Sequence, residues 1–322
     1  MTSSGVHISD NNRTLTPTLA EQITQGDHMK AVSRLRVGLV ATGVASLVLA
    51  SSVVAGASGT SGTYNAADAK LVPSMYKGTT LQVATDATYA PDEYMNNTTM
   101  VGFDVDLLGA VATTLGIKVH ENNVTFDNII AGIKGGRYAI GNSSFTDNKA
   151  REKQVNFVDY FQAGEGVYAK SNSSVKFTGF KSFCGLKVAV ETSTVEQTDA
   201  QTAAKACASN KKLTVISFPT QTEANAAVAS GQANVGFLDS QIAGYVAATS
   251  HGKFKLVGSA VNVAPYGIAT PKTTAGAQLA QAILAAMKTL VKNGTYGAIL
   301  KKWGVSAGAL TLGRMMLNGA TS

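Results

Sequence analysis

The residues with the clearest capacity for ligand chemistry lie in the stretch 143–153. Ser144 and Thr146 carry hydroxyls two positions apart, and Arg151 follows five residues after the second hydroxyl. Hydroxyls and nearby backbone N–H groups are short donors, and a guanidinium is a planar fork that can hold both oxygens of one carboxylate. The stretch therefore predicts a carboxylate-binding site. The alternative is that the hydroxyls cap a helix and Arg151 is a solvated surface charge, because hydroxyl-rich turns before helices are common.

Secondary-structure elements on both sides must position this stretch. The expected elements of the first unit are a strand at 80–85, a loop at 86–91, a helix that opens at 100–106 and ends at Gly116, a strand from 117, a helix at 129–134, a strand at 138–141 and an extended run at 155–158. Strands and helices that alternate in this way predict an α/β domain.

A second α/β unit follows a first crossing at 166–170 and a polar run at 171–174. Its expected elements are strands at 186–190, 213–216, 233–239 and 254–257, with helices at about 195–208 and at 221–230. A second crossing at 261–265 leads into a strand at 266–270 that returns to the first unit. An amphipathic helix over 279–291, a last helix at 296–303 and a loose tail after Val305 complete the expectation.

The composition favours a globular protein and disfavours a nucleic-acid binder. Hydrophobic residues make up 45% of the 322 residues and charged residues 15%, which is typical of a chain that folds around a core. The net charge of +7 comes from scattered lysines without a dense basic block. A nucleic-acid-binding protein would more often show a basic stripe or a recognisable module.

An export signal is expected near the start of the chain. Lys30, Arg34 and Arg36 precede an apolar run at 37–50, and residues 55–57 fit a small-x-small cleavage site. We therefore expect a signal peptide at 29–57, a non-native or over-annotated extension at 1–28, and a flexible linker at 58–78.

The protein is accordingly expected to be exported, either to the periplasm or to the extracellular, cell-surface side. The alternative is a retained anchor, because no charge occurs between Arg36 and Asp68 and an uncut segment of this kind could span a bilayer. No cysteine lies near the cleavage region, so a lipid anchor is not supported.

The two cysteines, Cys184 and Cys207, both lie in the exported part of the chain. In an oxidising compartment a disulfide between them is the leading interpretation, and two buried free thiols are the alternative. A metal site is not expected, because His120 and His251 are isolated and no further cysteine is present.

Several short motifs occur in a characteristic order. They are Thr85-Asp86-Ala87-Thr88-Tyr89-Ala90-Pro91, Val101-Gly102-Phe103-Asp104-Val105-Asp106-Leu107, Ser144-x-Thr146 with Arg151, Gln154-Val155-Asn156-Phe157, Gly185-Leu186-Lys187-Val188-Ala189-Val190, Asp239 after its strand, and Asn293-Gly294-Thr295-Tyr296 with Lys302-Trp303-Gly304. Over about Leu81 to Val305 the chain resembles the bacterial extracellular solute-binding proteins of amino-acid ABC importers, the polar amino-acid-binding family. The resemblance implies an α/β, two-lobed periplasmic-binding-protein (Venus flytrap) fold, in which helices flank a mixed sheet in each lobe and two hinge crossings join the lobes.

The resemblance also implies roles for eight residues. Arg151, with Ser144 and Thr146, would hold the α-carboxylate of an amino acid, and Asp239 would pair with its α-ammonium group. Tyr89 and Phe126 would flank the ligand side chain, and Ser193 and Thr194 would close on the carboxylate from the second lobe. Asp86 is a ninth candidate, because its carboxylate would put negative charge near the side-chain end. Two alternatives stay open: Asp239 as a helix cap, and the two aromatics as plain core residues.

The chain departs from the family pattern at two positions. Asp92, followed by Glu93, stands where the family usually has an aromatic residue, and Thr192 stands where a glycine is common. Together with Asp86 and Glu191, these acids put negative charge near the side-chain end. Our hypothesis is a ligand whose side chain is basic or a neutral hydrogen-bonder.

The implied function is capture of a free amino acid in an interlobe cleft and delivery to a membrane ABC permease. Lobe 1 is expected at 79–168 and 266–306, lobe 2 at 172–262, and a tail at 307–322. A monomer with no cofactor and no nucleic-acid partner is implied. The chain is not expected to be an enzyme, although a small-molecule dehydratase on the same scaffold and a ligand-sensing domain are the alternatives.

Overall fold

The computed structural model describes residues 60–320. The predicted extension and signal peptide lie outside the described residues. Within residues 60–320, none of the helices combines the length and apolarity needed to cross a lipid bilayer.

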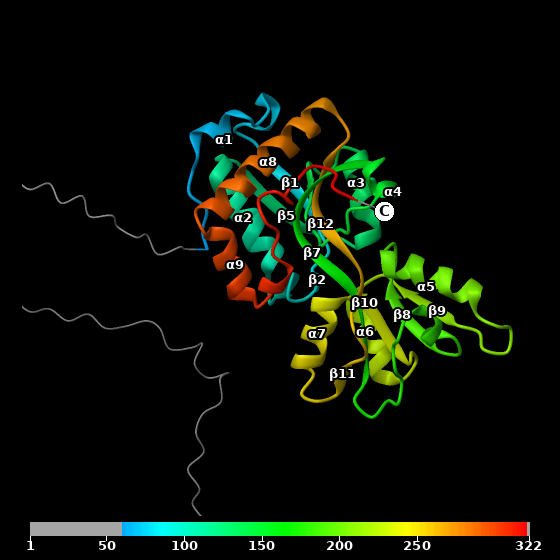
Figure 1. Ribbon diagram of the computed structural model, residues 1–322. Helices are drawn as coiled ribbons and strands as arrows, with labels where there is room; N and C mark the ends of the chain where they lie inside the picture. Colours follow the sequence, from blue (N-terminus) through cyan, green and yellow to red (C-terminus); the bar gives the residue numbers. More distant parts are fainter. Residues whose placement is uncertain (1–59, 321–322) are drawn as a thin grey trace, which may run out of the picture. The chain divides into compact units, whose positions relative to one another are not determined.

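Nine strands of the described region form one mixed sheet in the order β5-β1-β6-β12-β7-β10-β8-β9, with β11 also paired to β7 (Figure 1). Their bounds are β1 Thr80–Thr85, β5 Lys118–Asn123, β6 Ile140–Gly141, β7 Val155–Lys170, β8 Lys187–Glu191, β9 Thr214–Phe218, β10 Val235–Asp239, β11 Phe254–Leu256 and β12 Val261–Pro271. We call the half around β1, β5 and β6 lobe 1, and the half around β8 to β11 lobe 2. The mixed α/β class predicted from the sequence is confirmed.

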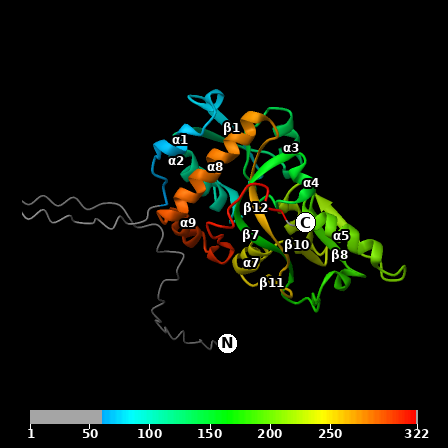
Figure 2. The same ribbon diagram turned by 45° about the horizontal axis from the view of Figure 1, so that its top comes forward.

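The long strands β7 and β12 run through both lobes and form the two crossings (Figures 1 and 2). They pair antiparallel from Glu165 opposite Val261 to Val155 opposite Pro271. The sequence predicted two separate extended runs where β7 is continuous. Gly164 lies between those two runs. The backbone of Val261 passes so close there that an added Cβ would lie 2.8 Å from its carbonyl oxygen, so the strand needs a glycine at this position.

Helices cover the sheet in both lobes (Figures 1 and 2). Their bounds are α1 Ala66–Lys70, α2 Phe103–Leu115, α3 Phe126–Lys134, α4 Lys149–Glu152, α5 Val195–Ala206, α6 Gln221–Ser230, α7 Ser240–Thr249, α8 Thr274–Lys292 and α9 Thr295–Trp303. Gly116 ends α2 with φ 65°, a left-handed conformation that glycine adopts without strain. Helix α7 was not predicted from the sequence, because its small and polar residues give little periodic signal.

Each lobe has its own hydrophobic core. In lobe 1, the apolar stripe of α8 packs against the sheet and α2, and its Leu279, Ile283 and Met287 are completely buried. In lobe 2, Phe183, Val188 and Phe237 lie in a separate cluster. Burying a side chain of this size stabilises the fold by about 1.5–3 kcal/mol. The two lobes are therefore held internally by different cores and joined by the two crossing strands.

A small antiparallel sheet in lobe 1 replaces part of the expected loop. It consists of β2 Thr88–Tyr89, β3 Glu93–Asn96 and β4 Thr99–Val101, in that order. The polar and proline content of 86–91 favoured a loop, but the backbone pairs Tyr89 with Glu93. This pairing places both side chains at the edge of the interlobe pocket described below.

The flexible linker predicted over 58–78 is wrong for its middle part. Asn65 caps α1 by accepting the N–H of Ala67 at 2.9 Å, and Asp68 accepts the Thr289 hydroxyl of α8 at 2.7 Å. Val72 is buried at 2% exposure. The polar residues that suggested a linker are the cap and the hydrogen-bonding partner that attach this segment to lobe 1.

The loose tail predicted after Val305 is also wrong. A short 3₁₀ turn at Ser306–Gly308 follows α9, and the chain then returns along β7. Leu310 and Met315 are buried at 5% and 1% exposure, and the carbonyl of Met316 accepts the N–H of Asp159 at 2.9 Å. The segment pairs with an otherwise open strand edge, which the sequence of the tail alone does not reveal.

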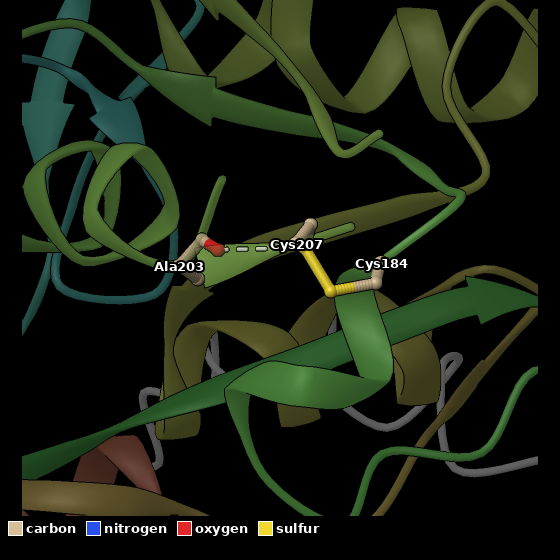
Figure 3. Close-up of a disulfide and its surroundings, with 3 residues drawn as sticks. All are labelled: Cys184, Ala203 and Cys207. Atoms are coloured by element: carbon tan, nitrogen blue, oxygen red, sulfur yellow. Dashed lines mark hydrogen bonds between the residues drawn. A yellow bond between two sulfur atoms is a disulfide. The ribbon is translucent and has the colours of Figure 1, made fainter. Parts of the chain in front are cut away.

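Cys184 and Cys207 form a disulfide in lobe 2 (Figure 3), as the export signal favoured. It connects the end of the turn Phe180–Phe183 to the end of α5. The sulfur of Cys207 lies 3.4 Å from the carbonyl oxygen of Ala203, a contact without a hydrogen bond because a disulfide sulfur carries no proton. The bridge anchors one end of α5, whose other end faces the pocket between the lobes.

Candidate functional site

Eight of the nine candidate residues line one pocket between the lobes. Its cavity volume is only about 10 Å³, so the walls from the two lobes lie close together. Lobe 1 contributes Asp86, Tyr89, Phe126, Ser144, Thr146 and Arg151, and lobe 2 contributes Thr194 and Asp239. The ninth candidate, Ser193, lies at its rim with an exposed side chain. Glu93 and Glu191, noted from the sequence as nearby acids, also line the pocket.

Arg151 is held in the pocket wall by two backbone carbonyls. Its Nη1 donates to the oxygen of Thr146 at 2.8 Å, and its Nη2 donates across the lobes to the oxygen of Ser193 at 2.9 Å. The side-chain oxygen of Asn148 caps α4 by accepting the N–H of Arg151 at 2.9 Å. Neutral carbonyls orient a guanidinium without neutralising it, so its charge stays free for an anion.

The guanidinium of Arg151 is buried and lies against two aromatic rings. Its central carbon is 5.3 Å from the ring centre of Phe126 and 5.4 Å from that of Phe145. The residue is only 8% exposed, so the alternative of a solvated surface charge is excluded. Burial lowers the pKa of Arg151, while the nearby Glu196 and Asp239 act to raise it.

Asp239 ends β10 at the pocket and is bonded to Tyr89 of the other lobe. The Tyr89 hydroxyl donates to Oδ2 of Asp239 at 2.8 Å, and the N–H of Asp239 donates to the same hydroxyl at 3.1 Å. Asp239 occupies the N-cap position of α7, but its side chain makes no capping bond. Burial raises the pKa of Asp239 to about 6, although hydrogen bonds from Tyr89 and Tyr266 and the charge of Arg151 oppose the rise.

The hydroxyl candidates are largely occupied by partners within the protein. The Ser144 hydroxyl lies 3.1 Å from Asp92 Oδ2 and 3.2 Å from Glu93 Oε2. The Thr194 hydroxyl donates to the Glu191 carbonyl at 2.9 Å and accepts the N–H of Gln197 at 3.1 Å, so it caps α5. Ser193 contributes its carbonyl rather than its hydroxyl to the contact with Arg151.

Asp86 and Glu191 face each other from opposite lobes. Asp86 accepts the N–H of Thr88 at 3.0 Å, the hydroxyl of Thr88 at 2.6 Å and the N–H of Phe126 at 2.9 Å. Glu191 is 3% exposed, and its Oε1 is buried without a partner. Burial raises the pKa of Asp86, and burial together with the charge of Asp86 raises that of Glu191 well above its ordinary range.

Three further residues line the pocket that were not predicted from the sequence: Ser143, Val195 and Glu196. Glu196 is 2% exposed and its Oε1 has no partner. Burial and the neighbouring Asp239 raise its pKa well above the ordinary value, with Arg151 opposing. The signal that could have found Glu196 is its place in the first turn of α5, directly after the predicted Ser193 and Thr194.

The pocket lining is strongly acidic. Its described residues include the carboxylic acids Asp86, Glu93, Glu191, Glu196 and Asp239 against the single cation Arg151. Within residues 60–320, no cluster of three or more His, Cys, Asp or Glu side chains has the arrangement of a metal site. Five buried acids against one guanidinium favour a bound cation or shared protons.

Residues 81–306 match the family of bacterial extracellular solute-binding proteins, family 3. The chain belongs to this family. A match of this length spans both lobes and every residue of the pocket described above. The two-lobed periplasmic-binding-protein fold that the resemblance implied is thereby confirmed, and the pocket lies between its two lobes.

Among the relatives of this solute-binding protein is the arginine-binding protein ArgT of Corynebacterium glutamicum. It is 30% identical over 214 residues, which cover 66% of this chain and 69% of ArgT. The glutamine-binding protein GlnH of Bacillus subtilis is 30% identical over 206 residues, covering 63% of this chain and 72% of GlnH. Both relatives are named as substrate-binding proteins for amino acids.

Solved structures of amino-acid-binding proteins have a similar fold. An ancestral arginine-binding protein bound to arginine has a TM-score of 0.64 and 31% identity, and covers 70% of this chain and 97% of that one. An ancestral amino-acid-binding protein described as a precursor of cyclohexadienyl dehydratase has the same TM-score of 0.64 at 30% identity, over 73% of this chain and 99% of that one.

The departure at position 92 has a structural consequence in this solute-binding protein. Asp92 is completely buried, and the side-chain amide of Gln241 in lobe 2 donates to its Oδ2 at 3.0 Å. The same amide donates to the Tyr266 hydroxyl at 2.6 Å. Burial and the neighbouring Asp104 raise the pKa of Asp92 well above its ordinary value. A carboxyl group at this position thus bonds the two lobes, which an aromatic ring could not do.

Proposed function

We propose that this protein is the extracellular substrate-binding component of an ABC importer, and that it captures a free amino acid between its lobes and presents it to a membrane permease. One observation carries the proposal: Arg151 and Asp239, from opposite lobes, line the same buried pocket. A zwitterion needs a cationic fork for its carboxylate and an anionic acceptor for its ammonium group. Family membership and the amino-acid ligands in the names of the relatives support this proposal.

The ligand's α-carboxylate would contact the free N–H groups of Arg151. A guanidinium has five N–H donors, and the two bonds to Thr146 and Ser193 leave the rest for a ligand. The α-ammonium group would lie between Asp239 and Glu196. The unpartnered Oε1 of Glu196 supplies an acceptor there, so ligand binding would satisfy a buried oxygen that has no other bond.

The side chain of the ligand would be basic. Asp86 and Glu191 approach from opposite lobes, and two buried carboxyl groups at close range cannot both be charged unless a cation lies between them. A guanidinium or ammonium group would provide that cation and give Glu191 Oε1 its missing partner. Phe126 would offer an aromatic face to the aliphatic or planar part of the same side chain.

Closure of the lobes follows from contacts on both sides of the pocket. Besides the bonds of Tyr89 and Arg151, the N–H of Gln221 in lobe 2 donates to the Thr88 hydroxyl of lobe 1 at 3.2 Å. A ligand that touches both lobes stabilises this closed form, because its binding energy is realised only when the lobes meet. A permease could then distinguish loaded from empty protein by the lobe arrangement.

Calorimetry on the purified protein tests the proposal. A panel of free amino acids should show binding of arginine, lysine or histidine, with glutamine weaker. Arg151→Ala should weaken that binding by roughly a hundredfold or more, because truncating one partner of a buried charge pair is expensive. Arg137→Ala, an exposed arginine outside the pocket, is the matched control and should bind normally. A panel without any binding, or an Arg151→Ala protein with wild-type affinity, refutes the proposal.

Export, a monomeric state and a permease partner belong to the same proposal. Members of the family are extracellular solute-binding proteins, which supports the exported location. Analytical ultracentrifugation should give a single species of monomer mass. A stable dimer would contradict the monomer.

An enzyme on this scaffold is the second candidate, supported by the likeness to the dehydratase precursor. Glu191 and Glu196 are buried acids with raised pKa values, and a dehydratase needs such a proton donor. The ancestral relative is itself described as amino-acid-binding, and we propose that the present chain is not an enzyme. Prolonged incubation with amino acids and cyclohexadienyl compounds should return each compound unchanged. Loss of water from any of them would favour the enzyme.

A further inference from the structure

Residues 309–320, which we call the C-terminal strap, lie outside the part of the chain that matches the family. The strap follows the turn Ser306–Gly308 and runs antiparallel to β7, with bridges from Ala309 to Phe161 and from Leu317 to Val158 (red segment in Figures 1 and 2). It therefore covers the edge of β7 in lobe 1 and leads from the crossing toward α4.

Asn318 attaches the strap to β7. Its side-chain Oδ1 accepts the N–H of Phe157 at 2.8 Å, and its own N–H donates to the carbonyl of Phe157 at 3.1 Å. The residue has φ 51°, a left-handed conformation that asparagine tolerates. This turn directs the following residues, Gly319 and Ala320, at the segment that carries Arg151.

The end of the strap contacts two acids near Arg151, and a third acid lies behind them. The N–H of Ala320 donates to Oε1 of Glu152, the neighbour of Arg151 in α4, at 3.1 Å. Gly319 lies against the carboxyl group of Asp159, where any side chain larger than hydrogen would collide with an oxygen. Asp159 in turn faces Asp147, and both acids are buried at 1% exposure.

Asp147 lies between the two residues that orient Arg151. Thr146 accepts the guanidinium through its carbonyl, and Asn148 accepts the backbone N–H of Arg151. Helix α4 has only four residues, and a single turn has no stability of its own because helix nucleation is unfavourable. The position of Arg151 must therefore come from tertiary contacts of residues 146–152. The pairing of Thr146 and Asp147 with β12 supplies some of them, and the strap supplies others from a different side.

We propose that the C-terminal strap is a positioning element for Arg151. By bonding to Glu152 and β7 and packing against Asp159 from outside the pocket, it keeps the guanidinium where the ligand's carboxylate would bind. The effect on ligand affinity rests on the proposed function, whereas the effect on the order of residues 146–152 does not. Arg151 is the residue that touches the ligand, and the strap acts through it.

Asn318→Gly tests the proposal without disturbing the left-handed backbone. The variant loses the bond to Phe157, and glycine adopts φ 51° without strain. Hydrogen exchange followed by mass spectrometry, without ligand, should show faster exchange over 146–153 and unchanged protection in α8. Affinity for the bound amino acid should fall by roughly three- to tenfold through faster dissociation, the range expected for one lost hydrogen bond.

Leu312→Ala, an exposed position of the same strap at 38% exposure, is the matched control and should change neither readout. Glu152→Ala removes the contact with Ala320 and should reproduce both effects of Asn318→Gly, whereas Lys149→Ala, which removes only the Lys149–Glu152 ion pair, should not. Unchanged exchange over 146–153 in both variants overturns the proposal, as does a uniform rise in exchange across lobe 1. If the wild-type protein binds no amino acid, the proposed function fails, and the exchange data still decide the role of the strap.

Discussion

The hydroxyl of Tyr89 in lobe 1 and the carboxylate of Asp239 in lobe 2 form a reciprocal pair. The hydroxyl donates to Oδ2 at 2.8 Å and accepts the backbone N–H of Asp239 at 3.1 Å. The group proposed to bind the ligand's ammonium is thus also a group that joins the lobes. Ligand binding and lobe closure would therefore depend on the same carboxylate.

Tyr89→Phe should favour an open arrangement of the lobes. The variant keeps the ring and loses both bonds of the hydroxyl, which together contribute about 1–3 kcal/mol. Small-angle X-ray scattering of the variant without added ligand should give a larger radius of gyration than that of the wild type, and ligand affinity should fall by roughly five- to 150-fold. Tyr64→Phe, exposed at 61%, is the control. Equal scattering curves for the two variants would contradict the role of the pair.

Glu191→Gln should alter the preference among ligands. The variant removes one of the two facing carboxyl groups but keeps the size and polarity of the side chain. Affinity for arginine or lysine should fall by roughly tenfold or more, because a hydrogen bond to a charged group is lost, while affinity for glutamine should change little. Glu223→Gln, an exposed glutamate of α6, is the control. A parallel loss for all ligands would show that Glu191 is structural and does not select the side chain.

The facing acids Asp86 and Glu191 should make the binding of a basic ligand depend on pH. Burial raises the pKa of both Asp86 and Glu191, so a cationic side chain that settles between them must displace a proton. Affinity for arginine should therefore rise as the pH increases above the ordinary range of carboxyl groups. Calorimetry in buffers of different ionisation enthalpy should detect the proton release, and Glu191→Gln should reduce it. A pH-independent affinity with no proton release would argue against a cation between the two acids.

Asp159 should make the fold less stable as pH rises. Burial and the facing Asp147 raise the pKa of Asp159 from 3.8 to about 8, with Glu152 adding to the effect. The folded protein keeps a proton that the unfolded chain releases above pH 3.8, so stability present at low pH is lost progressively up to about pH 8. The loss amounts to at most about 1.4 kcal/mol per pH unit for one proton.

Asp159→Asn removes this titration with little change in shape. Its thermal midpoint should fall less than that of the wild type between about pH 5 and pH 8. Asp127→Asn, at an exposed position of α3, should retain the wild-type slope. Identical slopes for all three proteins would mean that the Asp147–Asp159 pair does not hold a proton in the folded state.

Reduction of the disulfide should destabilise lobe 2 without abolishing its fold. Cys184 and Cys207 are separated by 23 positions, and closing a loop of this size stabilises a protein by about 3 kcal/mol. Urea unfolding with and without a reducing agent should show a lower midpoint in the reduced form. The variant Cys184→Ser with Cys207→Ser should match the reduced protein and should not respond to the reducing agent. A midpoint that reduction leaves unchanged would contradict a stabilising bridge.

The order of the elements and most of the pocket were predictable from the sequence. The amphipathic pattern of α8, the glycine after α2 and the strand that ends in Asp239 are local signals, because they follow from side-chain periodicity and backbone preference. The types and spacing of Ser144, Thr146 and Arg151 also pointed to a carboxylate site, because hydroxyls and a guanidinium are donors that suit a carboxylate. The resemblance to a known family then implied that Asp239, far along the chain, belongs to that site.

Other features were decided by tertiary structure alone. Polar segments such as Asn65–Asp68 and the C-terminal strap appear loose in sequence, because their partners, Thr289 and β7, lie far away in the chain. Whether a hydroxyl faces a ligand or a neighbouring acid, as for Ser144, depends on which side chains the fold places within 3 Å or so of it.

The resemblance placed several acids near the side-chain end of the site, but only the tertiary structure decided their charge states. Asp86 and Glu191 are 105 positions apart, as the difference of their residue numbers shows, and nothing in their local sequences indicates that they meet. Their pKa values rise because the fold removes both from water and brings them together. Local sequence determined which residues could bind an amino acid, and burial across the lobe boundary decided which charges they carry.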